Sequence, residues 1–325
     1  MNIDFSLLNT HMDLSDPGSS RVATIRQDAK QLILSVIRRE NLQVSKVIPL
    51  EAGMWSAVFW LSPLNIVLKF PNDVYEIDFL QCANTHGIPV PRLISDGYVE
   101  EHNPDPIYYV LMDYVPQTCN SEKIFYEGRL SHKQLLTLAD DIGHVLYKLH
   151  QVKLGFIGNR DVRFSQWGEL LRSRFKINPD NLVPTALFER ELLTTFKRIL
   201  QQSSYMRYTD GRLMHGDLHL GNTLVDMESF RLQAIIDPWD YMAGMPMYDL
   251  AYASLPWEYG MDYHTRVLTR YRALTDTFYS EYYFISLLIV AYWENRQLEM
   301  RNEIKRIREI IFDYVIPHIG AYPHL

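Results

Sequence analysis

Apolar residues recur at two different spacings along the chain, and the spacing changes near residue 115. In the first part, residues 21–39 place apolar side chains at helical intervals, and residues 73–86 do the same before a terminating glycine. Between and after these helices lie short segments that are rich in β-branched and aromatic residues and bounded by Gly or Pro, namely 44–51, 56–61, 66–70, 92–98 and 107–113. The pattern predicts a small antiparallel sheet of five strands, with one helix between the third and the fourth.

The second part of the chain is mainly helical. Ser131 and Gln134 form the sequence pattern of a capping box, and an apolar stripe follows at three- and four-residue intervals over 135–149. A helix must bury such a stripe against neighbouring elements. Further helices are predicted over 184–202, 282–299 and 301–315.

A short hairpin interrupts these helices, because 223–226 and 233–236 are brief apolar pieces separated by polar turn residues. We therefore expect an α+β fold of two lobes. The N-terminal lobe, 1–115, begins with a helical lead and contains the small sheet. The C-terminal lobe, 116–325, is mostly helical and contains the hairpin.

Composition excludes several classes of protein. Of the 325 residues, 47% are hydrophobic and 22% charged, which is typical of a globular chain and not of a disordered or coiled-coil one. The net charge of −7, from 32 Lys and Arg against 39 Asp and Glu, lacks the basic character of a nucleic-acid binder. A partner of positive charge fits this balance better than nucleic acid, whereas the oligomeric state is left open.

The two cysteines and the apolar runs indicate a cytoplasmic protein without a membrane partner. Cys82 and Cys119 show neither a disulfide framework nor the spacing of a zinc ribbon, so reduced thiols are expected. The longest apolar run, 282–293, is too short for the roughly 20 residues of a membrane-spanning helix and should be a buried helix. Residues 1–20 are acidic, which is unlike a signal or transit peptide.

The densest group of polar residues flanks the predicted hairpin. The segment 215–222 reads HGDLHLGN and ends where the first strand starts, while Asp237 follows the second strand. Because a hairpin brings its two ends together, Asn222 and Asp237 can share one cation, and Asp217 projects from the loop beside them. Hard oxygen ligands of this kind suit Mg²⁺, and phosphoryl transfer needs both a metal on the phosphates and a carboxylate that aligns the acceptor hydroxyl.

A zinc site in the same segment is disfavoured. His215 and His219 are four residues apart, as in a zinc-protease helix, but Gly216 stands where that helix carries its glutamate. Gly221 also argues against a helix there. His215 is therefore expected to be structural.

A lysine inside the third predicted strand is the main chemical signal of the N-terminal lobe. Lys69 lies mid-strand, where an ammonium group is tolerated only if it faces a partner or a ligand. Glu76, in the first turn of the following helix, is the expected partner. Asp78 points about 200° around the helix from Glu76 and is the weaker candidate.

HGDLHLGN, followed by IIDPWD at 235–240, resembles the signature of the aminoglycoside phosphotransferase and choline kinase family, whose fold is similar to that of protein kinases. The resemblance implies that Asp217 is the catalytic aspartate, and that Asn222 and Asp237 are magnesium ligands. It also implies that Asp249, in the segment YDLA, is a structural residue at a helix start, where a carboxylate commonly caps the helix.

The resemblance extends to the nucleotide-binding parts of the N-terminal lobe. It implies that Lys69 and Glu76 orient the phosphates of ATP or GTP, and that the backbone from Asp113 to Val115 meets the nucleobase. Ser56 and the backbone of 53–58 would cover the phosphates. In that loop a single glycine replaces the three of a protein kinase.

The acceptor is expected to bind after the metal aspartate, where aromatic and acidic residues alternate. Aromatic faces beside carboxylates suit an organic cation, since a desolvated cation–π contact contributes about 2 kcal/mol. Core packing of the aromatic side chains is the competing interpretation of the same residues. The candidates are Trp239, Asp240, Trp257, Glu258 and Tyr259.

These observations predict an ATP- or GTP-dependent phosphotransferase that uses Mg²⁺ and acts on a hydroxyl, or alternatively a nitrogen, of a small cationic metabolite or antibiotic. Two other functions stay open: a pseudokinase that binds nucleotide as an interaction module, and a protein kinase. The second is disfavoured, because Gly216 replaces the usual arginine of the protein-kinase catalytic loop and no Ala-Pro-Glu segment follows Asp237.

Overall fold

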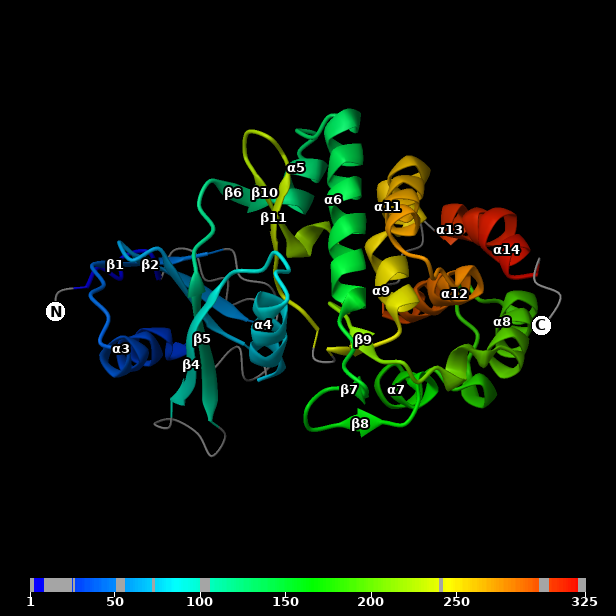
Figure 1. Cartoon of the computed structure of the whole chain (residues 1–325), viewed down its shortest axis with the longest axis horizontal. Coiled ribbons are helices and arrows are strands. Elements are labelled where there is room, and N and C mark those ends of the chain that lie inside the picture. Colours follow the sequence, from blue (N-terminus) through cyan, green and yellow to red (C-terminus); the bar gives the residue numbers. More distant parts are fainter. Residues whose placement is uncertain are drawn as a thin grey trace. The chain divides into compact units, whose positions relative to one another are not determined.

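The structure is a computed structural model that divides into two compact units, Met1–Thr118 and Cys119–Leu325 (Figure 1). The predicted lobe boundary after residue 115 lies just before this division. The structure describes residues 3–8, 25, 27–50, 56–71, 74–99, 106–239, 242–297 and 304–320.

The N-terminal unit is built on one antiparallel sheet of five strands in the order β1-β2-β3-β5-β4. All five predicted strands are present, with ends that differ by one or two residues. Helix α3 (Ala29–Arg39) precedes the sheet, and α4 (Tyr75–Thr85) lies between β3 and β4 as predicted. The strands are β1 (Lys46–Pro49), β2 (Ala57–Ser62), β3 (Ile66–Phe70), β4 (Leu93–Val99) and β5 (Ile107–Asp113).

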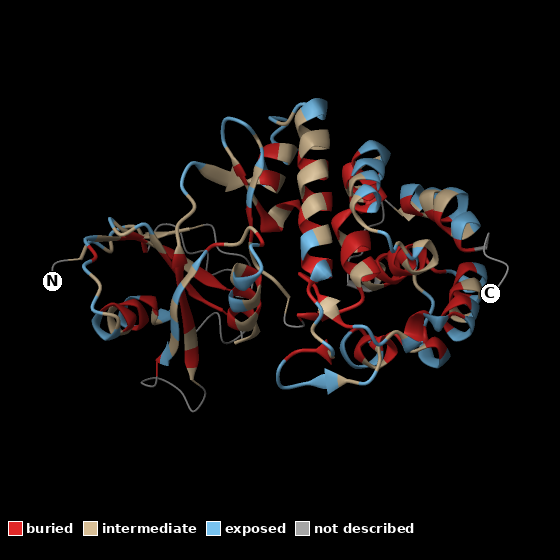
Figure 2. Cartoon of the chain, viewed as in Figure 1, coloured by how far each residue is buried: buried red, intermediate tan, exposed pale blue. Residues whose placement is uncertain are grey.

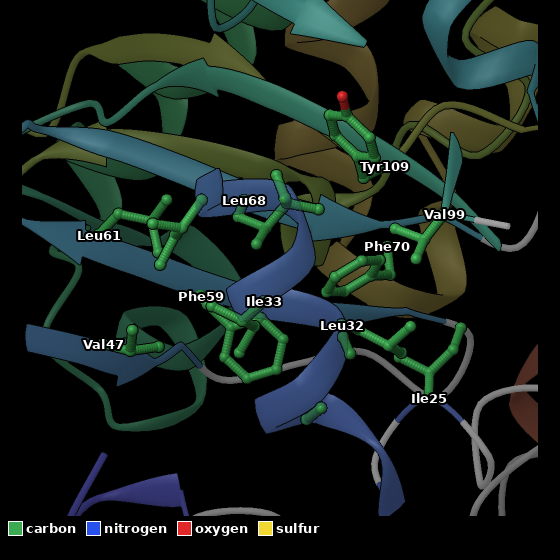
Figure 3. Packing of buried hydrophobic residues seen from close by; sticks show 14 of the residues in the cluster. Ile25, Leu32, Ile33, Val47, Phe59, Leu61, Leu68, Phe70, Val99 and Tyr109 are labelled. Carbon is green, nitrogen blue, oxygen red and sulfur yellow. The ribbon is translucent and has the colours of Figure 1, made fainter. Parts of the chain in front are cut away.

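The core of this unit lies between the sheet and α3. Alternate residues of β2 are buried, as the two-residue period of a strand requires, while β5 is buried along most of its length (Figure 2). Phe59 and Phe70 pack edge to face, with ring centroids 6.2 Å apart. Figure 3 shows that Leu32 and Ile33 of α3 reach into the same cluster. The predicted apolar face of the first helix is therefore a core face.

The C-terminal unit is mainly helical and has two small sheets, in the strand orders β11-β10-β6 and β8-β7-β12-β9. The predicted hairpin is β10 (Thr223–Asp226) with β11 (Leu232–Ile235). The other strands are β6 (Thr118–Asn120), β7 (Ile157–Gly158), β8 (Arg163–Phe164), β9 (Arg212–Leu213) and β12 (Ala243–Gly244). The α-helices are α5 (Ser121–Tyr126), α6 (His132–Gln151), α7 (Trp167–Arg174), α8 (Arg190–Gln202), α9 (Pro246–Ala253), α10 (Pro256–Tyr259), α11 (Met261–Leu274), α12 (Ser280–Gln297), α13 (Ile304–Ile310) and α14 (Ile316–Gly320).

The predicted helices of this unit are present, but several boundaries differ. Helix α12 begins at Ser280, two residues before the predicted start, and the helix predicted to end at residue 315 continues through a π-helical turn, Ile311–Val315, into α14. The capping box of Ser131 and Gln134 starts α6, with both of its reciprocal hydrogen bonds present. The predicted start of the helix over 184–202 is wrong, because α8 begins only at Arg190. Before it, the Thr185 hydroxyl accepts a hydrogen bond from the Phe188 N–H, so these residues form a separate turn instead of a first helical turn.

The core of the C-terminal unit is rich in aromatic residues. Helix α6 packs against α11, and α9 packs against α12. The apolar run 282–293 is the buried centre of α12, as predicted, and Tyr283 and Tyr292 are fully buried there. No helix in the described ranges is long and apolar enough to cross a membrane.

A buried histidine makes this core sensitive to acid. His264 of α11 lies between the Ser254 carbonyl (2.7 Å) and the hydroxyls of Tyr314 (3.0 Å) and Tyr283 (3.3 Å), and burial lowers its pKa from 6.5 to about 4. In the unfolded chain, His264 therefore takes up a proton as the pH falls below 6.5. In the folded chain it takes up this proton only as the pH falls to about 4. The free energy of unfolding should fall by about 3 kcal/mol between these pH values.

Urea titrations at pH 7 and pH 5 test this acid sensitivity. A His264→Gln variant should lose less stability between the two pH values than the wild-type chain does, because the buried imidazole is gone. His132→Gln is the matched control, since His132 is an exposed histidine of the same unit. An unchanged pH slope in His264→Gln contradicts the prediction.

Candidate active site

The loop 215–222 between β9 and β10 is held by a buried carboxylate. The His215 N–H donates to one oxygen of Asp249 at 2.9 Å, and the Gly216 N–H donates to the other at 2.8 Å. Asp249 lies inside α9 and has no exposed surface. The prediction that Asp249 caps this helix is wrong. The helix begins with Pro246, which has no N–H to be capped, and the carboxylate is directed to the loop.

His150 and Tyr271 in turn support the Asp249 carboxylate. Its carboxylate lies 3.3 Å from Nε2 of His150, whose Nδ1 lies 2.9 Å from the Tyr271 hydroxyl. Burial alone would raise the pKa of Asp249, but the hydrogen bond and charge of His150, together with the His215 N–H, hold it below its usual value. The group that anchors the loop is therefore an ionised carboxylate.

The imidazole of His215 joins the two ends of the hairpin. It is fully buried, and its Nε2 donates to the Ile236 carbonyl at 2.9 Å. The Trp239 N–H in turn donates to the His215 carbonyl at 2.8 Å. These contacts support a structural role for His215.

Gly216 occupies a position that admits no other residue without strain. Its φ is +78°, and a Cβ there would lie 2.8 Å from Cβ of Trp239. We expect Gly216→Ala to lower the free energy of unfolding by about 1–3 kcal/mol and to displace the loop. Chemical denaturation measures the first effect and turnover the second. Gly128→Ala, also at positive φ but with open space around it, separates backbone strain from the clash with Trp239.

The three residues predicted to carry the chemistry lie together. Nδ2 of Asn222 donates to the Asp217 carbonyl (2.7 Å) and carboxylate (3.0 Å), and lies 3.5 Å from the Asp237 carbonyl. Asn222 is buried, whereas the Asp217 side chain is 40% exposed. The amide thus fixes a carboxylate that an acceptor can still reach.

The donor set around Asn222 fits a magnesium ion better than zinc. With Nδ2 of Asn222 turned toward Asp217, the amide oxygen is left as a hard donor, and the Asp237 carboxylate is a second one. Zinc prefers nitrogen and sulfur ligands. Among the described residues, no group of three or more His, Cys, Asp or Glu side chains could hold a metal ion.

Sequence analysis missed Tyr252, which contacts Asp217 directly. Burial, together with the nearby Asp217 carboxylate and the charges of Tyr248 and Glu294, raises the pKa of Tyr252. The Tyr252 ring stacks on the Tyr248 ring with an interplanar angle of 24°. Tyr252 lies three residues after Asp249, which places both on neighbouring positions of one helix face. The three-residue spacing from Asp249 was the sequence signal that could have identified Tyr252.

His219 and Glu122 were also missed as partners of the site. Nδ1 of His219 lies 3.6 Å from the Glu122 carboxylate, and Nε2 lies 3.9 Å from that of Asp217. Burial opposes protonation of His219, but the contact with Glu122 and the charges of Asp217 and Glu122 raise its pKa. The contact with His219 lowers the pKa of Glu122. Both shifts favour the charged forms, while in this structure Nδ1 of His219 accepts a hydrogen bond from the Gly221 N–H, as a neutral imidazole does.

The structure separates the predicted acceptor residues into two groups. Trp257 and Tyr259 are core residues with 4% and 7% exposure, so the core-packing interpretation describes them and the acceptor prediction is corrected. Trp239 is half-buried and packs on Phe175. Glu258 accepts a hydrogen bond from the Tyr126 hydroxyl. Asp240 lies outside the described residues.

A further carboxylate lies next to Trp257. Glu294 of α12 accepts a hydrogen bond from the Trp257 indole at 3.2 Å. The negative charge of Glu294 also contributes to the raised pKa of Tyr248 and of Tyr252. Together with Asp217, Glu294 gives this part of the C-terminal unit a local excess of negative charge.

In the N-terminal unit, the predicted pairing of Lys69 with Glu76 is present. Nζ of Lys69 lies 2.7 Å from the Glu76 carboxylate, and both residues are buried. Lys69 lies opposite Val58 and Val110 in the neighbouring strands, so the central position of β3 fixes where the ammonium group can point. A buried pair of this kind is costly unless a ligand or further hydrogen bonds satisfy its remaining polar atoms.

The predicted nucleobase segment follows β5. The Asp113 N–H donates to the Arg92 carbonyl at 3.0 Å, and its carboxylate pairs with the Arg92 guanidinium at 2.9 Å. The Val115 carbonyl accepts from the Thr118 hydroxyl at 2.8 Å. Ser56 is buried directly before β2, and residues 53–55 of the predicted phosphate loop lie outside the described residues.

Comparisons with known proteins agree with this arrangement. The profile of a phosphotransferase enzyme family matches residues 46–283. Wild-type aminoglycoside 2'-phosphotransferase-IIIa, solved with GDP, is similar with a TM-score of 0.59 and 17% identity over 91% of this chain and 99% of that one.

Two further solved structures are similar over most of the chain. Aminoglycoside phosphotransferase APH(3'')-Id from Streptomyces rimosus, solved with ADP and streptomycin, has a TM-score of 0.52 and 19% identity over 82% of this chain and 98% of that one. A thermostable mutant of aminoglycoside phosphotransferase APH(4)-Ia, solved with ADP and hygromycin B, has a TM-score of 0.56 and 14% identity over 88% of this chain and 97% of that one. At these identities the likeness shows a shared two-lobed α+β fold.

Proposed function

The chain belongs to the phosphotransferase enzyme family, and on this basis we propose that it transfers the γ-phosphate of ATP or GTP to a hydroxyl of a small, positively charged metabolite or antibiotic. The observation that carries the proposal is the Asp217 carboxylate, which is 40% exposed while Asn222 and Tyr252 fix its direction. A carboxylate held in this way can align an acceptor hydroxyl and take its proton.

The nucleotide is proposed to contact the N-terminal unit at Lys69 and at the backbone of 113–115. The ion pair with Glu76 holds the Lys69 ammonium in one position, where it can bind phosphate oxygens. Similar structures hold GDP in one case and ADP in two others, so both ATP and GTP belong in the assay.

Magnesium is proposed to bind with the nucleotide through Asn222 and Asp237. When bound, the ion neutralises charge on the phosphates. The chain itself holds the amide of Asn222 in place through the Asp217 carbonyl and carboxylate. Because Mg²⁺ loses its waters reluctantly, two protein ligands alone should bind it weakly. Isothermal calorimetry should show little Mg²⁺ binding without nucleotide, and tight binding in its absence contradicts the assignment.

A cationic acceptor is proposed from the charges around Asp217. The carboxylates of Asp217 and Glu294 both raise the pKa of the same tyrosines of α9, and the half-buried Trp239 lies two residues after Asp237 in the chain. Similar structures hold streptomycin and hygromycin B. An ammonium group would be attracted both by the carboxylates and by the aromatic faces.

A phosphate-transfer screen tests the function and the acceptor class together. The chain is incubated with ATP or GTP, Mg²⁺ and pairs of hydroxyl compounds that differ only by an amino group. We expect the amine of each pair to be phosphorylated faster and its KM to rise between 0.1 M and 1 M salt, as the Debye length falls from about 10 Å to 3 Å. Faster turnover of the neutral compounds overturns the cationic acceptor alone. Nucleotide binding without any turnover favours the interaction module instead.

A further inference from the structure

Three consecutive residues at the start of α5 contact the loop that carries Asp217. The Asn120 side chain caps α5, accepting from the Glu122 N–H at 3.0 Å, and its amide donates to the Gly221 carbonyl. The Ser121 hydroxyl donates to the Leu220 carbonyl at 2.8 Å. Glu122, the third residue, faces His219. An amide, a hydroxyl and a carboxylate side chain at the start of α5 therefore all contact the loop.

The imidazole of His219 lies between two carboxylates. Glu122 lies 3.6 Å from its Nδ1, and Asp217 lies 3.9 Å from its Nε2. The Gly221 N–H lies 3.1 Å from the same Nδ1, and the Tyr252 ring meets the imidazole edge to face at 6.4 Å. Contacts on several sides leave the imidazole little freedom to rotate.

Gly221 makes room for this arrangement. A Cβ at position 221 would lie 2.4 Å from Cε1 of His219 and 2.8 Å from an oxygen of Glu122. Any larger residue would push both side chains aside. The backbone of the loop and the two side chains are thus in close contact, and the absence of a side chain at position 221 is what allows it.

We propose that Glu122 and His219 are positioning residues for Asp217. Glu122 holds the imidazole, and Nε2 of the imidazole lies 3.9 Å from Oδ2 of Asp217, the same oxygen that Nδ2 of Asn222 contacts, so that Asp217 keeps the orientation in which it meets the acceptor hydroxyl. This inference rests on the proposed phosphotransfer and assigns to the pair a role in turnover. Neither residue is proposed to touch the acceptor or the phosphates.

The arrangement predicts a specific kinetic pattern. Glutamine at either position keeps a polar side chain of similar reach but loses the charge. His219→Gln should lower kcat about tenfold, and Glu122→Gln should lower it by a smaller factor of about three, because a misplaced reacting group slows the chemical step. The KM for nucleotide should stay within about twofold of wild type, since neither residue holds nucleotide.

His132→Gln is the matched control. His132 pairs with Asp262 at 3.1 Å, as His219 pairs with Glu122, but at an exposed site of the same unit. Its kcat should equal that of wild type. Thermal midpoints of all variants, measured together with the kinetics, identify any loss of kcat that comes from unfolding, and the kinetics are run well below the lowest midpoint.

Combination with Asp217→Asn separates positioning from a general structural effect. A residue that acts through Asp217 has nothing left to position once that carboxylate is gone, so His219→Gln should not slow the residual rate of Asp217→Asn any further. A second tenfold loss in that background overturns the proposal. So does wild-type kcat in both single variants, or an effect of Glu122→Gln confined to the acceptor KM. A wild-type chain that never transfers phosphate would overturn the proposed function as well.

Discussion

Replacement of Asp217 by asparagine is expected to lower turnover by about 10² to 10⁴, which is the usual contribution of a general base. The substitution keeps the size of the side chain but removes its ability to take the acceptor proton. Because Asp217 belongs to the C-terminal unit and is not assigned to nucleotide binding, the affinity for ATP or GTP should be nearly unchanged. Steady-state kinetics with the best acceptor of the screen measures the first quantity, and nucleotide titration of the free enzyme measures the second.

Asp161→Asn provides the control for this experiment, because it makes the same chemical change at an exposed surface position of the same unit. It should leave both kcat and nucleotide affinity as they are. Turnover of Asp217→Asn at the wild-type rate would remove Asp217 from the catalytic assignment. A parallel loss of nucleotide affinity would mean that Asp217 acts in binding instead of proton transfer.

The second large effect is expected for Asp249→Ala, which removes the buried anchor of the catalytic loop. The variant leaves the N–H groups of His215 and Gly216 without their acceptors, in a place with no access to water. The two unsatisfied buried donors and the lost contact with His150 cost about 3–5 kcal/mol together. The variant should therefore unfold at much lower denaturant concentration, and the folded fraction should turn over slowly because the loop has lost its support.

The contribution of Asp249 to the free energy of unfolding changes with pH in a definite direction. The folded pKa of Asp249 is below its unfolded value, so its contribution to stability is complete above about pH 4 and is lost as the pH falls through the folded pKa. At pH 7 the full difference between wild type and Asp249→Ala should be visible. Asp313→Ala removes an exposed carboxylate of the same unit and should have almost no effect. Equal stability of Asp249→Ala and wild type at pH 7 contradicts the anchoring role.

Much of the fold could be predicted because its signals are local. The two-residue alternation of β2 and the capping box of Ser131 depend on neighbours within a few residues, and such patterns appear directly in the order of amino acids. The pairing of Lys69 with Glu76 also belongs to this class. An ammonium group in the middle of a strand needs a partner, and Glu76 is only seven residues away.

The meeting of Asp217, Asn222 and Asp237 could be predicted for a related reason. A hairpin returns the chain to its starting point, so residues at its two ends are neighbours whatever the rest of the fold does. The resemblance to a known family then assigned them roles. Together these arguments identified the residues of the catalytic loop and the class of reaction.

Tertiary structure alone decided the surroundings of those residues. Asp249 contacts a loop 34 residues earlier in the chain, and Asn120 binds a carbonyl 101 residues away, distances over which spacing in the sequence predicts nothing. The burial of Trp257 was decided in the same way, because an aromatic residue is equally suited to a core and to a ligand until its neighbours are known. The sequence thus determined which residues are proposed for the chemistry. The packing of α5, α9 and α12 around the loop determined what holds these residues in place, since side-chain direction depends on contacts between elements that the linear order does not contain.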